Sequence, residues 1–136
     1  MRYIIAIILL AVTLTATELQ WLDNYSVAIK KAKKENRPIY IFISSSTCGW
    51  CDKFEKTTLQ DENIKKRLNR EFISVHLVRE FDDVPQKFAT TPVPRHYFTN
   101  SKGDILYNSL GYAKVDTFEL FMSNAEEKFT MKQENK

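Results

Sequence analysis

The sequence is poor in cysteine: its 136 residues contain two, Cys48 and Cys51, only three positions apart. A disulfide stabilises a fold mainly by closing a long loop of the unfolded chain. In that model a four-residue loop gives roughly 2 kcal/mol, against about 4 to 5 kcal/mol for a loop near 100 residues. A purely structural role for a Cys48–Cys51 disulfide is therefore not favoured. The absence of a second C-x-x-C pair also argues against a zinc site, so we expect no metal.

Long apolar runs are also scarce, and residues 4–14 form the notable one. Eleven residues are too few to span a bilayer, which takes roughly 20. The run follows Arg2 and precedes a polar stretch ending at Glu18, which is typical of a secretory signal peptide. We expect residues 1–17 to be this peptide, with an uncleaved membrane tether as the alternative, and a periplasmic or otherwise extracytoplasmic location. No cysteine directly follows the apolar run, which argues against a lipoprotein anchor.

Charge of one sign is not concentrated anywhere. The formal net charge is +3, and basic residues are interleaved with acidic ones. Nucleic-acid binding would require Lys and Arg gathered on one face or stripe, so this class of function is not expected. The lysines of residues 30–34 fit the solvated face of a helix. With no repeat or low-complexity segment, we expect one domain over residues 18–130 and a disordered tail over residues 131–136.

Hydrophobic periodicity then predicts the elements. Residues 39–43 are β-branched or aromatic without alternation, as in a strand buried on both faces. The order of the elements predicts an α/β domain whose mixed central sheet has helices on both faces. The predicted helices cover residues 19–35, 48–58, 61–70, 84–88 and 115–129, and the predicted strands cover residues 39–43, 72–78, 96–99 and 105–108.

The two cysteines lie where the buried strand leads into a helix, after the capping-type residues 44–47. Residues three apart share a helix face, so the two sulfurs can meet. A helix N-terminus favours the thiolate, the attacking form of cysteine. We therefore assign Cys48 as the nucleophile and Cys51 as the resolving thiol of a disulfide exchange that needs no other cofactor. Trp50 between them is either an apolar contact for substrate or a packing residue.

Residues 48–68 combine C-x-x-C with Phe-Glu-Lys, a threonine step, an aspartate and an amphipathic helix. This run resembles thioredoxin-like proteins, in particular the periplasmic C-terminal domain of transmembrane thiol:disulfide interchange reductases. The resemblance covers roughly residues 19–122 and implies a thioredoxin fold. It also implies a cis bond between Val93 and Pro94 that faces the disulfide, where the proline leaves a backbone edge free for an extended substrate segment. Pro92 is the competing candidate.

Two positions depart from the family pattern. Thioredoxins carry a buried acid six residues before the first cysteine, where this chain has Phe42. Glu55, one turn after Cys51, is the nearest candidate for the proton transfer, although a solvated helix glutamate is the alternative. Arg95 follows the proline; if it faces Cys48 it would stabilise the thiolate and make the protein more oxidising, and if it points to solvent it would have no effect.

These features predict an exported thiol:disulfide oxidoreductase that acts on protein thiols and disulfides. No histidine lies between the cysteines to favour the thiolate, so a reductant is expected, supplied with electrons by a membrane thiol reductase and acting as a monomer. Elsewhere His76 and His96 fit packed strand residues. The alternatives are an oxidase or isomerase of the same fold, and a binding module whose disulfide is structural.

Overall fold

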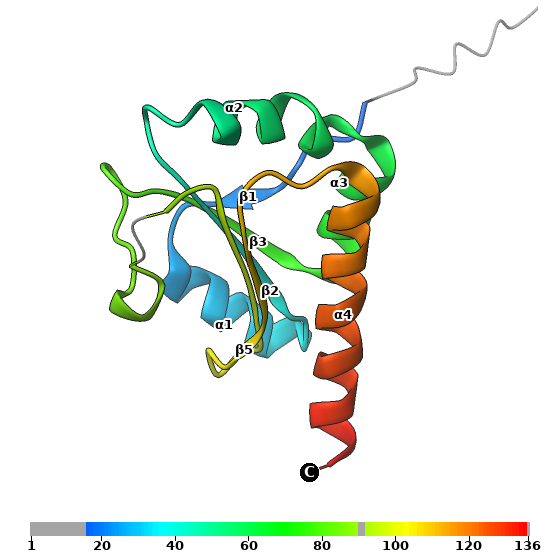
Figure 1. Cartoon of the computed structure of the whole chain (residues 1–136). Helices are drawn as coiled ribbons and strands as arrows, with labels where there is room; N and C mark the ends of the chain where they lie inside the picture. Colours follow the sequence, from blue (N-terminus) through cyan, green and yellow to red (C-terminus); the bar gives the residue numbers. More distant parts are fainter. Residues whose placement is uncertain (1–15, 90–91, 136) are drawn as a thin grey trace, which may run out of the picture.

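The computed structural model of the chain describes residues 16–89 and 92–135. Almost all of the predicted signal peptide, residues 1–15, lies outside this part. A five-stranded sheet forms the centre, in the order β1-β3-β2-β4-β5 (Figure 1). The strands are β1 (Trp21–Leu22), β2 (Ile39–Ser44), β3 (Ile73–Val78), β4 (Arg95–Thr99) and β5 (Ile105–Leu110).

The sheet is mixed, as the sequence predicts. The central strand β2 runs parallel to β3 and antiparallel to β4. Strand β1 pairs parallel with β3, and β5 pairs antiparallel with β4. The sheet therefore ends in a hairpin on one side and in a two-residue strand on the other.

Helices cover both faces of this sheet, which confirms the predicted layers. They are α1 (Tyr25–Glu35), α2 (Gly49–Lys56), α3 (Glu62–Glu71) and α4 (Val115–Glu134), with short 3-10 turns at Thr58–Gln60 and Gln86–Phe88. Buried residues of α1 pack into one hydrophobic cluster, and those of α2, α3 and α4 pack into the other. The chain thus places α1 on one face and the remaining three helices on the opposite face.

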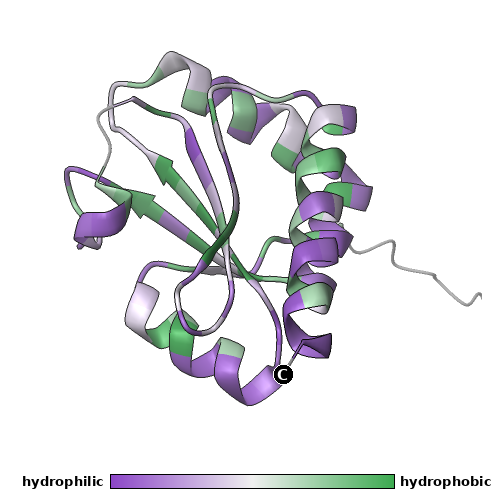
Figure 2. Cartoon of the chain, turned by 60° about the horizontal axis from the view of Figure 1, so that its bottom comes forward, coloured by the Kyte–Doolittle hydropathy of each residue, from purple (hydrophilic) through white to green (hydrophobic). Residues whose placement is uncertain are grey.

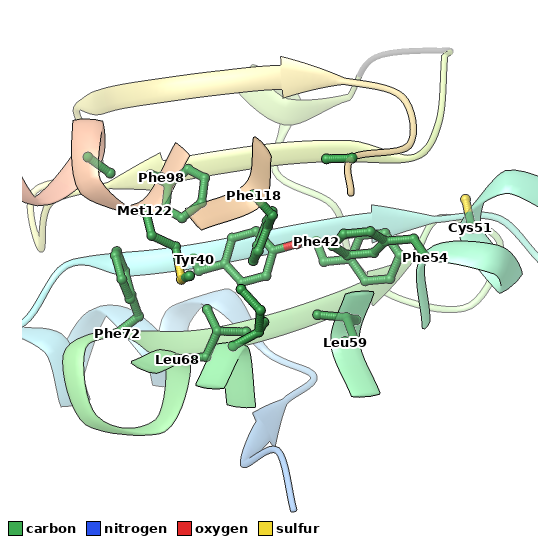
Figure 3. Close-up of a cluster of buried hydrophobic side chains, with 13 residues drawn as sticks. Tyr40, Phe42, Cys51, Phe54, Leu59, Leu68, Phe72, Phe98, Phe118 and Met122 are labelled. Carbon is green, nitrogen blue, oxygen red and sulfur yellow. The ribbon is translucent and has the colours of Figure 1, made fainter. Parts of the chain in front are cut away.

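Strand β2 is buried along its whole length, so its side chains divide between the two faces. Tyr40 and Phe42 enter the aromatic cluster under α2 and α4, which Figure 3 shows. Their rings lie 5.2 Å from Phe118 and 5.3 Å from Phe54, between ring centroids, in edge-to-face contacts. The opposite face receives Ile39, Ile41 and Ile43.

The predicted helix over residues 19–35 is wrong at its beginning. Trp21 and Leu22 form β1 instead, and α1 starts after Asn24. The Asn24 side chain accepts a hydrogen bond of 3.1 Å from the Val27 N–H, a helix cap that fixes the first turn. The apolar period of the sequence does not reveal this cap, because Trp21 and Leu22 are apolar in either element.

Helix α4 runs on to Glu134, so the predicted disordered tail over residues 131–136 is wrong for most of its length. Its last turns have partners from distant parts of the chain. Gln133 and Asn36 exchange two amide hydrogen bonds of 3.0 and 3.3 Å, and Lys132 Nζ lies 3.6 Å from an Asp104 carboxylate oxygen. Along α4 apolar and polar residues alternate, as Figure 2 shows, and within residues 16–89 and 92–135 no helix is long and apolar enough to cross a membrane.

Candidate active site

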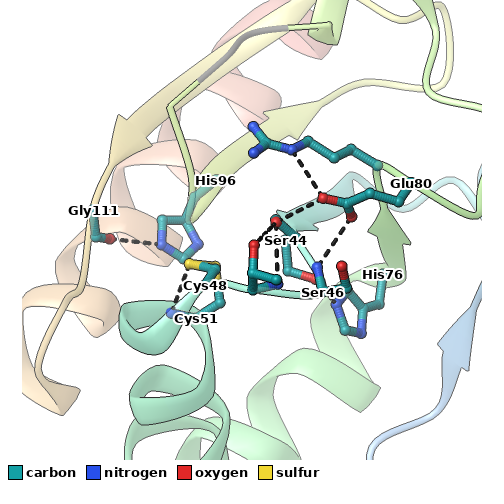
Figure 4. Close-up of a disulfide and its surroundings, with 11 residues drawn as sticks. Ser44, Ser46, Cys48, Cys51, His76, Glu80, His96 and Gly111 are labelled. Atoms are coloured by element: carbon teal, nitrogen blue, oxygen red, sulfur yellow. Dashed lines mark hydrogen bonds and ion pairs between the residues drawn. A yellow bond between two sulfur atoms is a disulfide. The ribbon is translucent and has the colours of Figure 1, made fainter.

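The two cysteines form a disulfide where the chain leaves β2 and enters α2 (Figure 4). Cys48 is the N-cap of α2 and Cys51 lies in its first turn, with their Cα atoms 5.2 Å apart. The backbone N–H of Cys51 donates a hydrogen bond of 3.1 Å to Cys48 Sγ. A helix N-terminus carries a partial positive charge, so this position favours negative charge on the Cys48 sulfur.

The two sulfurs differ in access. Cys51 has 0% of its surface exposed and packs with Phe54 in the buried cluster, whereas Cys48 is only partly buried. An incoming disulfide can therefore approach Cys48 and not Cys51. This asymmetry is the arrangement that a nucleophilic and a resolving cysteine require.

Trp50 lies in the first turn of α2, between the two cysteines, and is 59% exposed. Its ring lies 5.9 Å from that of Tyr112, and Lys53 Nζ stands 5.0 and 4.9 Å from the two ring centroids. We call Trp50, Lys53 and Tyr112 the aromatic patch. Tyr112 carries no signal in the sequence, because it follows β5 and only folding brings it next to α2.

Val93 and Pro94 precede β4, and the peptide bond between them is cis. Pro94 is buried, and its carbonyl accepts a hydrogen bond of 2.8 Å from the Gly111 N–H. Val93 is partly exposed and packs against the same buried cluster as Cys48. Val93 also packs against the cluster on the α1 face, so this segment contacts both clusters at the start of β4.

Arg95 lies on the other face of the sheet. Its guanidinium donates a hydrogen bond of 2.9 Å to Asn108 and stacks over Tyr97 at 5.2 Å from the ring centroid. Tyr97 belongs to the cluster on the α1 face, whereas Cys51 belongs to the opposite cluster. Of the two orientations considered for Arg95, the structure does not give the one that faces Cys48.

Glu55 is half-buried on α2, one turn after Cys51. Burial raises the pKa of its carboxyl, the nearby Asp52 raises it further, and Lys56 opposes them. Its Oε1 lies 3.8 Å from Nδ1 of His76, whose Nε2 is 2.7 Å from the Ser44 hydroxyl. His76 packs against Phe42, with 4.6 Å between ring centroids, as expected for a packed strand residue. It also lies between the Glu55 carboxyl and the Ser44 hydroxyl, a polar contact that the sequence did not predict.

A second polar contact fixes the segment before Cys48. The Glu80 carboxylate accepts hydrogen bonds from the Ser45 hydroxyl at 2.7 Å and from the Ser46 N–H at 3.0 Å. The Ser45 bond is the main reason that the pKa of Glu80 lies below its usual value. Glu80 follows β3, in a segment without periodicity, so the sequence offered no signal for this contact.

No group of three or more His, Cys, Asp or Glu residues that could hold a metal ion occurs among the residues that the structure describes. Both cysteines are engaged with each other. The groups that the structure places around this disulfide include the Glu55 carboxyl, the Ser44 hydroxyl and the His76 imidazole.

Comparison with known proteins places this site in a family. The family model Thioredox_DsbH, described as "Protein of unknown function, DUF255", matches residues 10–93, more than half of the chain. Over 60 residues the chain is 43% identical to Spermatogenesis-associated protein 20 of Rattus norvegicus. That stretch is 44% of this chain but only 8% of the length of the relative.

Solved structures agree on the fold. A DsbH oxidoreductase superposes with a TM-score of 0.64 at 20% identity, covering 85% of this chain and 87% of that one. The oxidised C-terminal domain of DsbD from Neisseria meningitidis gives a TM-score of 0.61 at 19% identity, covering 77% of this chain and 99% of the other. The fold predicted from the family resemblance, that of thioredoxin, is therefore confirmed.

Proposed function

The chain belongs to the thioredoxin-like Thioredox_DsbH family, and from this we propose that it is a thiol:disulfide oxidoreductase acting on protein partners through Cys48 and Cys51. The observation that carries the proposal is the placement of the pair: Cys48 is accessible at the N-cap of α2, and Cys51 is buried one turn inside it. The helix N-terminus stabilises the attacking thiolate of Cys48, and the buried sulfur of Cys51 is positioned to resolve the mixed disulfide.

The exchange has two steps. The Cys48 thiolate attacks one sulfur of a substrate disulfide, which forms a mixed disulfide and releases the first substrate thiolate. Cys51 then loses its proton and attacks the Cys48 sulfur, which releases the second substrate thiolate. The substrate gains two electrons, and the chain ends with the Cys48–Cys51 disulfide. No cofactor beyond the dithiol enters this balance.

Substrate docking is assigned to the surface around Cys48. The segment at Val93 and Pro94 offers a backbone edge to an extended chain, as the family resemblance implies. The exposed ring of Trp50, which is tilted by 38° against that of Tyr112, offers an apolar contact. We assign Trp50, Val93 and Pro94 to substrate binding, and we expect one protomer to be sufficient for it.

We assign the direction of a reductant, because Gly49 and Trp50 between the cysteines bring no cationic group to stabilise the thiolate. The names of two structural neighbours, a DsbH oxidoreductase and an oxidised DsbD C-terminal domain, fit a redox exchange of this kind, and we place it outside the cytoplasm. In that compartment the oxidised chain would be re-reduced by a membrane thiol reductase. The signal-type sequence at residues 1–17 supports the location.

Equilibration of the purified domain with glutathione and dithiothreitol buffers tests this assignment. A reductant should give a reduction potential near or below about −250 mV together with turnover of insulin disulfides. An oxidase or isomerase would instead lie near about −120 to −180 mV. A disulfide that neither reduces insulin nor exchanges with glutathione would leave a binding module, and the proposal would be wrong.

Glu55 is assigned as the acceptor of the Cys51 proton, since it lies one turn away and its pKa is raised by burial. Glu55→Gln should slow release of the second substrate thiol by about 10²- to 10⁴-fold, the range for loss of a general base. The first attack by Cys48 should keep its rate. Rapid-quench separation of the two steps measures both, with Glu127→Gln on the exposed face of α4 as the matched control. Equal slowing of both steps would contradict the assignment.

A further inference from the structure

His96 is a polar side chain inside the aromatic cluster below the disulfide. It lies in β4, two residues after Pro94, and none of its surface is exposed. Its ring centroid lies 4.7 Å from that of Phe54 and 5.7 Å from that of Phe118. Burial of a polar group costs free energy unless it is hydrogen-bonded, so the partners of this ring show what holds it there.

Both ring nitrogens have a partner. Nε2 lies 3.0 Å from the Gly111 carbonyl oxygen, and Nδ1 lies 2.8 Å from the Tyr40 hydroxyl. A carbonyl can only accept, so Nε2 carries the hydrogen. Burial lowers the pKa of His96 to about 4, which leaves Nδ1 free to accept from the Tyr40 hydroxyl at neutral pH. The imidazole is thus a neutral bridge between β2 and Gly111.

Gly111 connects this bridge to the docking surface. Its carbonyl accepts from His96, and its own N–H donates 2.8 Å to the Pro94 carbonyl (Figure 4 shows the His96 bond). Its φ of +94° is a left-handed conformation that suits glycine. The next residue is Tyr112 of the aromatic patch. Both parts of the docking surface therefore meet at one residue, Gly111, whose carbonyl is bonded to His96.

We propose that His96 is a positioning residue for protein substrates: by holding the Gly111 carbonyl it sets Pro94 and Tyr112 relative to Cys48. This rests on the proposed function, and it assigns His96 to docking rather than to sulfur chemistry. Loss of the Nε2 bond should weaken binding of a protein disulfide. A small disulfide that contacts only the Cys48 sulfur should react at the same rate as with the wild-type protein.

Three substitutions separate docking from stability. In His96→Asn the shorter amide reaches the Nδ1 position but not Gly111, so KM for insulin should rise by about tenfold, the value of one buried hydrogen bond, with kcat within about twofold. His96→Gln carries its amide to the Nε2 position and should restore KM. Tyr40→Phe removes the other bond of the same ring; it should lower the urea midpoint and leave KM unchanged.

Two further readings complete the test. Reduction of 5,5′-dithiobis(2-nitrobenzoate) should proceed at the same rate in all variants, and amide hydrogen exchange at Gly111 should accelerate in His96→Asn alone. Equal rises of KM in His96→Asn and Tyr40→Phe, or no rise in either, would overturn the positioning role. Wild-type protein that reduces neither disulfide would overturn the proposed function itself, and the docking role with it.

Discussion

Replacement of Cys48 by alanine should abolish insulin reduction, and replacement of Cys51 by alanine should leave a protein that reacts once and stays attached to its substrate. In both variants steady-state turnover should fall by about 10³-fold or more, as when other enzymes lose a covalent nucleophile. The difference arises because the attacking sulfur is accessible and the resolving sulfur is buried one turn below it.

Non-reducing gel electrophoresis and intact mass measure this difference. Incubation of Cys51→Ala with a disulfide-containing substrate should give a covalent adduct that dithiothreitol removes, whereas Cys48→Ala should give none. Alanine replacement of the buried Cys51 changes packing, so urea unfolding of both variants is the control for folding. Equal trapping by the two variants would show that either sulfur can attack, and the assigned order of steps would be wrong.

The free energy of unfolding should fall by about 3 kcal/mol between pH 7 and pH 4 because of His96 alone. The pKa of this buried ring is about 4 in the fold, against 6.5 for an ordinary histidine, chiefly because burial disfavours its charged form. Between these values the unfolded chain binds a proton that the folded chain does not. The contribution of neutral His96 to the free energy of unfolding is therefore fully present above pH 6.5 and is lost as the pH falls towards 4.

Urea unfolding followed by tryptophan fluorescence at pH 7.0, 5.5 and 4.0 checks this dependence. In His96→Asn the titrating group is absent, so the fall over this interval should shrink by about 3 kcal/mol. His76, whose pKa is also lowered by burial, remains in both proteins and supplies the residual slope. Parallel curves for the two proteins would show that His96 titrates normally in the fold.

Local sequence signals were sufficient to predict where Cys48 and Cys51 lie in the fold. The continuous apolar run of β2 is buried on both faces as predicted, and the following polar residues lead to Cys48 at a helix N-cap. These features depend on neighbours a few residues apart, so they can be read along the chain. The expectation that Val93 and Pro94 face the disulfide came instead from the family resemblance, because they are more than forty residues away in the sequence.

The groups around the pair could not be predicted in the same way. Glu55 meets His76 only because α2 lies over β3, and Trp50 meets Tyr112 only because β5 ends beside α2. Arg95 shows the converse, since alternation along β4 turns it away from the face of His96. Such pairs are set by strand register and helix packing, which leave no periodic signal in the sequence.

The hydrogen bonds that hold the last turn of α4 to Asn36 have a practical consequence. Gln133 donates a hydrogen bond to Asn36 near the C-terminal end of α4. Figure 1 shows that this end of α4 lies at the opposite end of the molecule from α2. A tether, dye or solid support joined beyond Asn135 would be attached at the end of the domain away from the disulfide. The protein could thus be fixed to a sensor chip by its C-terminal end with Cys48 turned outward to the flowing solution.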